Sequence, residues 1–81
     1  MIYWVYIIKD GADRLTAGLS SELCNFLIRD HFHSVVYLRP FTIPIDAVAH
    51  KHLLDDLSLS SLWKLVRNNQ EFTNMIMKTK A

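Results

Sequence analysis

The chain has 81 residues, of which 51% are hydrophobic and 21% are charged. This length allows one domain at most, and the composition excludes a disordered chain, which would carry fewer apolar residues. Nine Lys and Arg residues against eight Asp and Glu residues give a net charge of +1, without the basic excess of a dedicated nucleic-acid binder. The single cysteine, Cys24, excludes an intramolecular disulfide and suits a reducing compartment. Because no apolar run is long enough to span a bilayer and no secretory leader is recognisable, we expect a cytoplasmic domain without a membrane partner.

The first third of the chain predicts a β-hairpin. Ile2–Ile8 is β-branched and aromatic without a helical period, which is typical of a central strand covered on both faces. Asp10–Asp13 is a turn cluster in which Gly11 can adopt a positive φ, so Arg14–Leu19 is expected to pair back as the second strand. Gly18 weakens that strand unless a neighbour needs close approach to its backbone.

The middle of the chain predicts a helix, a strand and a second helix. Ser21–Asp30 has a serine cap and apolar residues at helical spacing. Ser34–Phe41 is typical of a third strand, and Pro40 near its end indicates a strand end or a sheet edge. Pro44 suits the first turn of the second helix. The apolar face of that helix is expected to contain Ile45, Val48, Ala49, His52, Leu53 and Leu57.

The last third predicts a third helix capped by Ser58 or Ser60. Its inward residues are expected to be Leu62, Leu65 and Val66, with Trp63 beside them. Residues 69–81 are either a short docked helix or a frayed tail, and three of them keep helical spacing as a partner-binding or capping face: Phe72, Met75 and Ile76. The predicted order is ββαβαα, an α+β domain over residues 1–68 in which a small three-stranded antiparallel sheet packs with helices.

This order of elements resembles the GIY-YIG endonuclease domain, and more closely the small stand-alone bacterial members of that superfamily. The segments that carry the resemblance are Tyr3–Lys9, Arg14–Ser20, Ser34–Phe41 and Ala47–Ser58. It covers roughly residues 1–68, with one deletion: only Asp30–His33 stands where small members have a longer basic loop. A groove that follows a nucleic-acid backbone needs such basic residues to neutralise phosphates.

The resemblance implies a cleft lined by a tyrosine from each motif, an arginine from the first helix and a metal-binding glutamate from the second. Phosphodiester hydrolysis needs these parts as proton acceptor, phosphate clamp and metal ligand. The corresponding cleft positions of this chain are Tyr6, Thr16, Gly18, Phe26, His31 and Lys51, where His31 is adjacent to the family's histidine position at Asp30. Phe26 replaces the arginine and Lys51 the glutamate, so neither the phosphate clamp nor the metal ligand carries over.

We therefore expect a nuclease-like domain that has lost catalysis and serves as a binding module, with no catalytic residue, metal or cofactor. A protein partner or self-association is favoured over DNA because the charges are balanced. One alternative is a divergent Mg²⁺- or Mn²⁺-dependent DNA endonuclease with a site rebuilt from Tyr6, Arg29, His31 and Asp55. Another is a non-catalytic DNA-binding adaptor. A histidine metal site from His31 and His33 with His50 or His52 has no supporting motif, and solvated histidines are expected instead.

Overall fold

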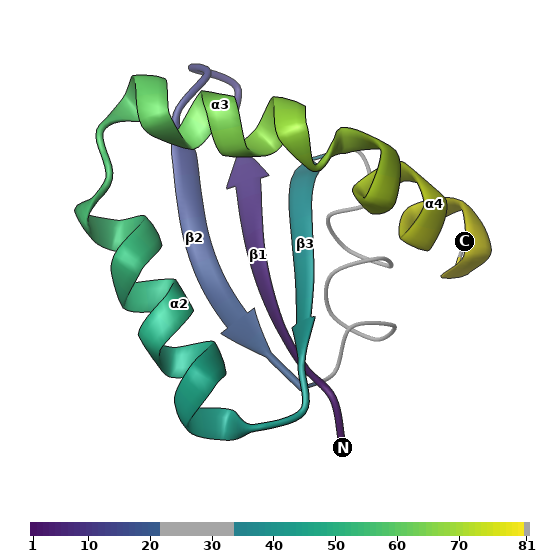
Figure 1. Cartoon of the computed structure of the whole chain (residues 1–81). Coiled ribbons are helices and arrows are strands. Elements are labelled where there is room, and N and C mark those ends of the chain that lie inside the picture. Colours follow the sequence, from purple (N-terminus) through teal and green to yellow (C-terminus); the bar gives the residue numbers. More distant parts are fainter. Residues whose placement is uncertain (22–33, 81) are drawn as a thin grey trace.

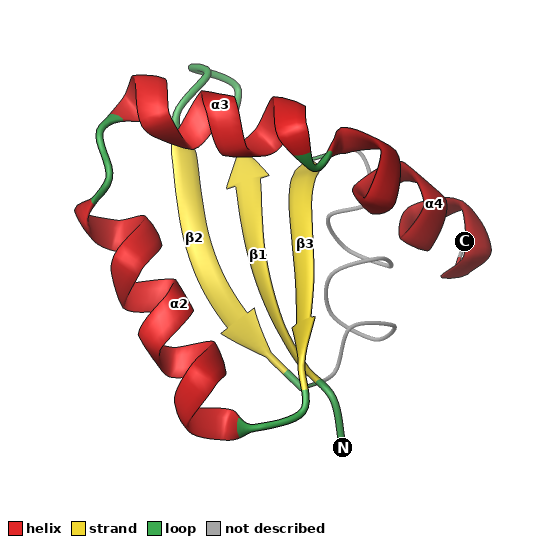
Figure 2. Ribbon diagram, viewed as in Figure 1, coloured by secondary structure: helices red, strands yellow, loops and turns green. Residues whose placement is uncertain are grey.

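The computed structural model of the chain describes residues 1–21 and 34–80 (Figure 1). Its strands and helices, labelled as in Figure 1, are β1 (Tyr3–Lys9), β2 (Leu15–Ser20), β3 (Val35–Phe41), α2 (Pro44–Asp56), α3 (Leu59–Asn68) and α4 (Gln70–Lys80). The predicted α+β class with a small antiparallel sheet is confirmed (Figure 2). The helix predicted over Ser21–Asp30 falls, apart from Ser21, outside the described residues.

The sheet has the strand order β2-β1-β3, and both pairs are antiparallel. β1 is the central strand, as its two apolar faces predict. Tyr6 at its middle lies opposite Gly18 of β2 on one side and Leu38 of β3 on the other. β3 is an edge strand of this sheet, so Pro40 near its end occupies a position where a missing N–H is tolerated.

The hairpin turn between β1 and β2 is organised by Asp10. Its Oδ1 accepts hydrogen bonds at 2.9 Å from the backbone N–H groups of Ala12 and of Arg14, and its Oδ2 accepts one at 3.0 Å from the Arg14 guanidinium. The hydrogen bond from the Arg14 N–H contributes most to lowering the pKa of Asp10, because it favours the ionised carboxyl. The residue with a positive φ is Asp13 (61°), and Gly11 does not take the role expected of it. Asp tolerates this region because its short polar side chain bonds locally.

Alternation along the strands divides the core into two clusters, one on each face of the sheet. Trp4, Val35 and Leu38 are buried on one face. On that face Phe72 and Ile76 of α4 pack against them, together with Tyr6 and Ile8. The buried residues of the other face, which α2 and α3 cover (Figure 1), are Val5, Ile7, Tyr37, Ala47, Leu54 and Val66.

The buried face of α2 differs from the predicted one. Ala47 and Leu54 face the sheet, whereas Ile45, Val48 and Leu53 are exposed. Apolar residues occur on both sides of this helix, so its hydrophobic pattern does not select one direction. Packing against β1 and β2 selects the side that carries Ala47, where the small residue allows close approach to the sheet.

The two C-terminal helices have identifiable local anchors. Ser58 is the cap of α3, since its hydroxyl accepts the Ser61 N–H at 3.3 Å. Residues 70–80 form a helix docked on β3, held by Asn69 and Thr73. Asn69 Nδ2 donates to the Leu38 carbonyl at 2.8 Å, and the Leu38 N–H donates to Thr73 Oγ1 at 3.1 Å. These bonds satisfy both backbone groups of Leu38 on an edge strand.

Candidate functional site

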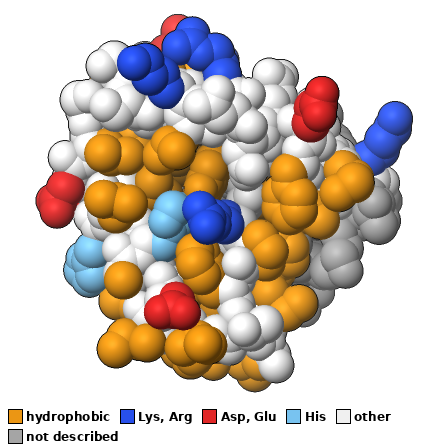
Figure 3. Space-filling view, in the orientation of Figure 1, with side chains coloured by type: hydrophobic (Ala, Val, Ile, Leu, Met, Phe, Trp, Pro, Cys, Tyr) orange, Lys and Arg blue, Asp and Glu red, His pale blue; other side chains and the backbone are white. Residues whose placement is uncertain are grey.

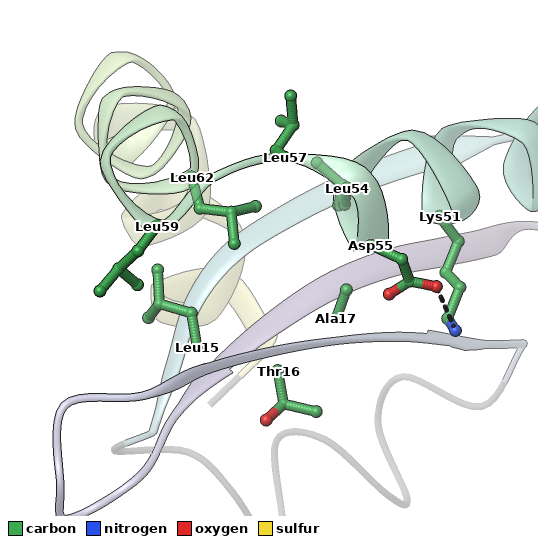
Figure 4. Close-up of a pocket in the computed structure, with 9 residues that line it drawn as sticks. All are labelled: Leu15, Thr16, Ala17, Lys51, Leu54, Asp55, Leu57, Leu59 and Leu62. Atoms are coloured by element: carbon green, nitrogen blue, oxygen red, sulfur yellow. Dashed lines mark hydrogen bonds and ion pairs between the residues drawn. The ribbon is translucent and has the colours of Figure 1, made fainter.

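A pocket of about 510 Å³ opens between β2, the C-terminal half of α2 and the start of α3 (Figure 4). Its described lining residues are Leu15, Thr16, Ala17, Lys51, Leu54, Asp55, Leu57, Leu59 and Leu62. The turn at Leu57 and Ser58 ends α2 and begins α3, which brings leucines from both helices to the same mouth. The pocket is therefore mostly aliphatic, with one ion pair in its wall, and the Thr16 side chain points away from it on the other side of β2 (Figure 4).

The ion pair in the pocket joins two residues one turn apart on α2. Lys51 Nζ lies 2.8 Å from Asp55 Oδ2, and both side chains remain partly open to solvent. Lys51 lies on the sheet side of the helix, four residues after Ala47 and three before Leu54. Its aliphatic stem can cover apolar wall while the ammonium reaches the carboxylate, as long cationic side chains commonly do.

The residues of this pocket do not fit the divalent metal that the family resemblance implies. Asp55 is the single carboxylate among the described lining residues, and Lys51 already neutralises it. Mg²⁺ requires an octahedral set of oxygen ligands, and a neighbouring ammonium repels it. Throughout the described part of the chain, no group of three or more His, Cys, Asp or Glu side chains is placed to hold a metal ion.

The predicted cleft residues are divided between the two faces of the sheet. Lys51 lies in the pocket, whereas Thr16 borders it only through its position in β2, because its side chain points to the other face of the sheet (Figure 4). Tyr6 instead packs with the Trp4 cluster on the opposite face, where its ring lies over Gly18 so closely that a Cβ atom there would overlap it. The close approach at Gly18 is therefore to the Tyr6 ring. Phe26 and His31 lie outside the described residues, as do Arg29, Cys24 and His33.

A second constellation, which the sequence did not predict, lies where β3 meets α2. Tyr37, Arg39 and Phe41 alternate along β3 and therefore share the face that α2 covers. The Tyr37 hydroxyl and His50 Nε2 share a hydrogen bond at 2.9 Å, and the two rings are stacked with centroids 6.1 Å apart. The His50 ring is also tilted against Phe41, with centroids 5.3 Å apart, and the Arg39 guanidinium lies 5.4 Å from the Phe41 centroid.

Burial changes the acid–base behaviour of both bonded rings. It lowers the pKa of His50 by disfavouring the imidazolium, and the Arg39 charge acts in the same direction. It raises the pKa of Tyr37, because a phenolate in this position would be poorly solvated, although Arg39 opposes the shift. Both groups are thus held neutral near pH 7, which suits a stable neutral hydrogen bond between strand and helix. The sequence signal that could have predicted this contact is the alternating Tyr-x-Arg-x-Phe pattern of the strand, followed by a helix that contains a histidine.

Beside this constellation is a shallow hollow of about 480 Å³ at the start of α2. Its described lining residues are Ile2, Arg39, Pro40, Phe41, Thr42, Ile43 and Asp46. The face of the molecule seen in Figure 1 carries hydrophobic side chains around a histidine and a basic side chain near its centre (Figure 3). This face combines apolar surface with isolated charges rather than with a continuous basic track.

Comparison with known proteins found no matching family model, curated protein or solved structure. Among the described helices, none has the length and apolar content needed to cross a membrane.

Proposed function

We propose that this chain is a non-catalytic interaction domain with a GIY-YIG-like fold. One observation carries the proposal: the position that the resemblance assigns to the metal-binding glutamate is Lys51, whose ammonium is paired with Asp55 at 2.8 Å. A hydrolytic site would need that position to hold a cation, and an ammonium cannot ligate one.

The distribution of the other cleft residues supports the same proposal. A tyrosine that helps activate water must lie within hydrogen-bond distance of the reacting groups. Tyr6 packs with the Trp4 cluster on one face of the sheet, whereas Lys51 lines the pocket on the other face, and the described lining of that pocket does not include Tyr6. Removing a single transition-state donor costs about 10²–10³-fold in rate, and here the arginine position is a phenylalanine as well.

A protein surface suits this domain better than DNA as a partner. The net charge is +1, whereas DNA affinity comes mainly from Lys and Arg residues that neutralise phosphates. Large apolar side chains are instead exposed along α2, among them Ile45 and Leu53. Exposed apolar surface of this kind, rimmed by polar residues, marks interaction sites.

The test is nicking of supercoiled and branched DNA in the presence of Mg²⁺ or Mn²⁺. We expect no cleavage above the protein-free blank, and any trace from a contaminating nuclease should be equal in a Tyr6→Phe preparation. Metal-dependent nicking by the wild-type chain that disappears in Tyr6→Phe would show an active endonuclease and overturn the proposal. Salt-sensitive retention of DNA without cleavage would favour the adaptor alternative.

A further inference from the structure

β2 is an edge strand, and among the described residues it pairs with β1 alone. Edge strands are commonly protected from further pairing by charged side chains, by proline or by a covering element. The β3 edge carries Arg39 and Pro40. Asn69 and Thr73 also form hydrogen bonds with the backbone of Leu38 on that strand. The sequence of β2, Leu-Thr-Ala-Gly-Leu-Ser, contains neither a charged residue nor a proline, so this edge lacks the protection that β3 has.

Alternate residues of β2 direct their backbone groups away from β1. The Asp10 N–H donates to the Arg14 carbonyl at 2.9 Å, and hydrogen-bonded pairs recur at every second position of an antiparallel ladder. In the register of this hairpin, Thr16 and Gly18 are therefore bonded to β1. The residues whose N–H and C=O groups point outward are Leu15, Ala17 and Leu19.

The aliphatic pocket lies beside these outward groups. Leu15 and Ala17 belong to its β2 wall, and their side chains are on the face that α2 and α3 cover, whereas Thr16 between them points to the other face (Figure 4). The only charges in the described lining are those of Lys51 and Asp55, which neutralise each other. A strand laid along β2 would therefore bring alternate side chains to a pocket that offers aliphatic surface and no unpaired charge.

We infer that an extended segment of another protein adds antiparallel to β2 and inserts alternate leucine or isoleucine side chains into this pocket. Peptides that extend a sheet gain affinity from main-chain hydrogen bonds and specificity from pockets for alternate side chains, and β2 offers both together. Antiparallel pairing is the more stable kind, and directly opposed residues share a face, so the inserted residues are those that bond Leu15 and Ala17. The inference rests on the proposed function as an interaction domain and names the chemistry of its partner.

A second copy of this chain fits the same edge less well. Antiparallel pairing of β2 with β2 would present Leu15 and Leu19 of one copy to the pocket of the other. Both side chains already pack in the cluster that α2 and α3 of their own subunit cover. A segment without helices of its own keeps its aliphatic side chains free to enter the pocket.

The probe is a synthetic peptide in which leucine alternates with threonine, with a lysine at each end for solubility and a fluorophore for anisotropy measurements. Because one added strand makes few contacts, we expect a dissociation constant on the order of 10–100 μM. Replacing a leucine that enters the pocket by alanine should weaken binding by at least about tenfold, since its apolar surface is no longer buried. No binding of the leucine peptide at millimolar concentration would overturn the inference.

Methylation of the peptide backbone tests the strand pairing itself and leaves the protein unchanged. A methyl group on a backbone nitrogen removes that donor. Methylation at the leucines should abolish binding, because in the antiparallel register their N–H groups face β2. Methylation at the intervening threonines is the matched control and should preserve binding, since those N–H groups face away from β2. Equal effects of the two modifications, or a larger effect at threonine, would contradict the proposed pairing.

Amide hydrogen exchange locates the peptide on the protein. In the free chain, Leu15, Ala17 and Leu19 should exchange faster than Thr16 and Gly18, and the peptide should slow the exchange of the first three. Unchanged exchange at these three amides in the complex would place the peptide elsewhere and overturn the inference. A free chain that sediments at twice its 9.4 kDa mass with the three amides already protected would also overturn it, because a second copy would then occupy the edge.

Two neighbouring variants test the pocket. Leu59 lines the pocket and is 54% exposed, whereas Ser60 is exposed and is not among the described lining residues. Leu59→Asp and Ser60→Asp each add a carboxylate to the first turn of α3, where negative charge is favourable, so both chains should fold. Leu59→Asp should weaken peptide binding by at least about tenfold, because it removes apolar wall and adds a charge. Ser60→Asp should bind as the wild type does, and equal affinities of the two variants would contradict insertion into this pocket.

This result is separable from the test of the proposed function. A chain that neither binds the peptide nor cleaves DNA removes the strand-addition site and leaves the loss of catalysis standing. A chain that nicks DNA in a Tyr6-dependent manner removes the proposed function whatever its affinity for the peptide.

Discussion

At the scale of single residues, the chemistry of the pocket is decided by Lys51. Lys51 is on the side of α2 that faces β2. The type of residue at this position determines whether the pocket can bind a cation. With lysine, the ammonium is paired with Asp55 and no carboxylate of the described lining remains free of a cationic neighbour. Gly18 has a different role, since it makes room for the Tyr6 ring on the opposite face of β2.

The contact between Tyr6 and Gly18 predicts a strongly coupled pair. Gly18→Ala forces the Tyr6 ring to move, which we expect to cost about 1–3 kcal/mol of the free energy of unfolding. In a Tyr6→Ala background the same change should be neutral, or stabilising by about 0.5–1 kcal/mol, because alanine loses less backbone entropy than glycine. Guanidinium chloride unfolding of the four chains measures the coupling. Additive effects of the two substitutions would contradict the overlap.

At the scale of elements, α4 covers one face of the sheet and contacts its β3 edge. Its Phe72 and Ile76 cover the face that carries Trp4 and Leu38. Asn69 and Thr73 form hydrogen bonds with the backbone C=O and N–H groups of Leu38. An edge strand with unpaired N–H and C=O groups is prone to pair with other chains, and the hydrogen bonds from Asn69 and Thr73 reduce that risk at Leu38. Residues 70–80 are therefore part of the packed structure and not a loose extension of it.

The hydroxyl of Thr73 is expected to contribute more than its methyl group. Thr73 is 2% exposed, and its Oγ1 accepts the Leu38 N–H. Thr73→Val keeps the shape but leaves that buried donor unsatisfied, which should cost about 1–3 kcal/mol. Thr73→Ser keeps the hydroxyl and loses one methyl group, so its cost should be smaller, about 0.8 kcal/mol. Denaturant unfolding compares the two variants, and a valine variant as stable as the serine variant would contradict the proposed role of the bond.

At the scale of the whole molecule, the hydrogen bond between Tyr37 and His50 connects the sheet to α2 and makes global stability depend on pH. The pKa of His50 is lowered from its usual 6.5 chiefly by burial, so the unfolded chain binds this proton first as the pH falls. The pKa of Tyr37 is raised from its usual 10.0, again chiefly by burial, so the unfolded chain loses that proton first as the pH rises. Stability is therefore lost at both ends of the pH range.

We expect the free energy of unfolding to increase with pH through the window just below 6.5 and to decrease above pH 10. His50→Gln removes the titrating ring, so the difference in stability between wild type and variant should be largest near pH 7–8 and shrink on acidification. Chemical denaturation at a series of pH values measures both curves. Parallel curves for the two chains below pH 6.5 would show that His50 does not titrate differently in the two states.

Parts of this structure that depend on neighbouring residues alone were predictable. The β-branched and aromatic run at the start became the central strand, Pro44 begins α2, and Ser58 caps α3. The positive φ at Asp13 was not predictable from composition, since Gly11 is the conformationally freer residue of the turn. Asp10 decides it, because its carboxylate accepts two backbone N–H groups and thereby shapes the whole turn.

The sequence by itself determined the α+β class, the three strands and the starts of α2 and α3, because these follow from side-chain branching, turn residues and caps within a few positions. Only the tertiary structure decided which side of α2 is buried. Ile45, Val48 and Leu53 are as apolar as Ala47 and Leu54, and contact with the sheet chose between the two sides. It also decided that Tyr6 and Lys51 belong to opposite faces, because that follows from strand register and helix placement, which no local pattern encodes.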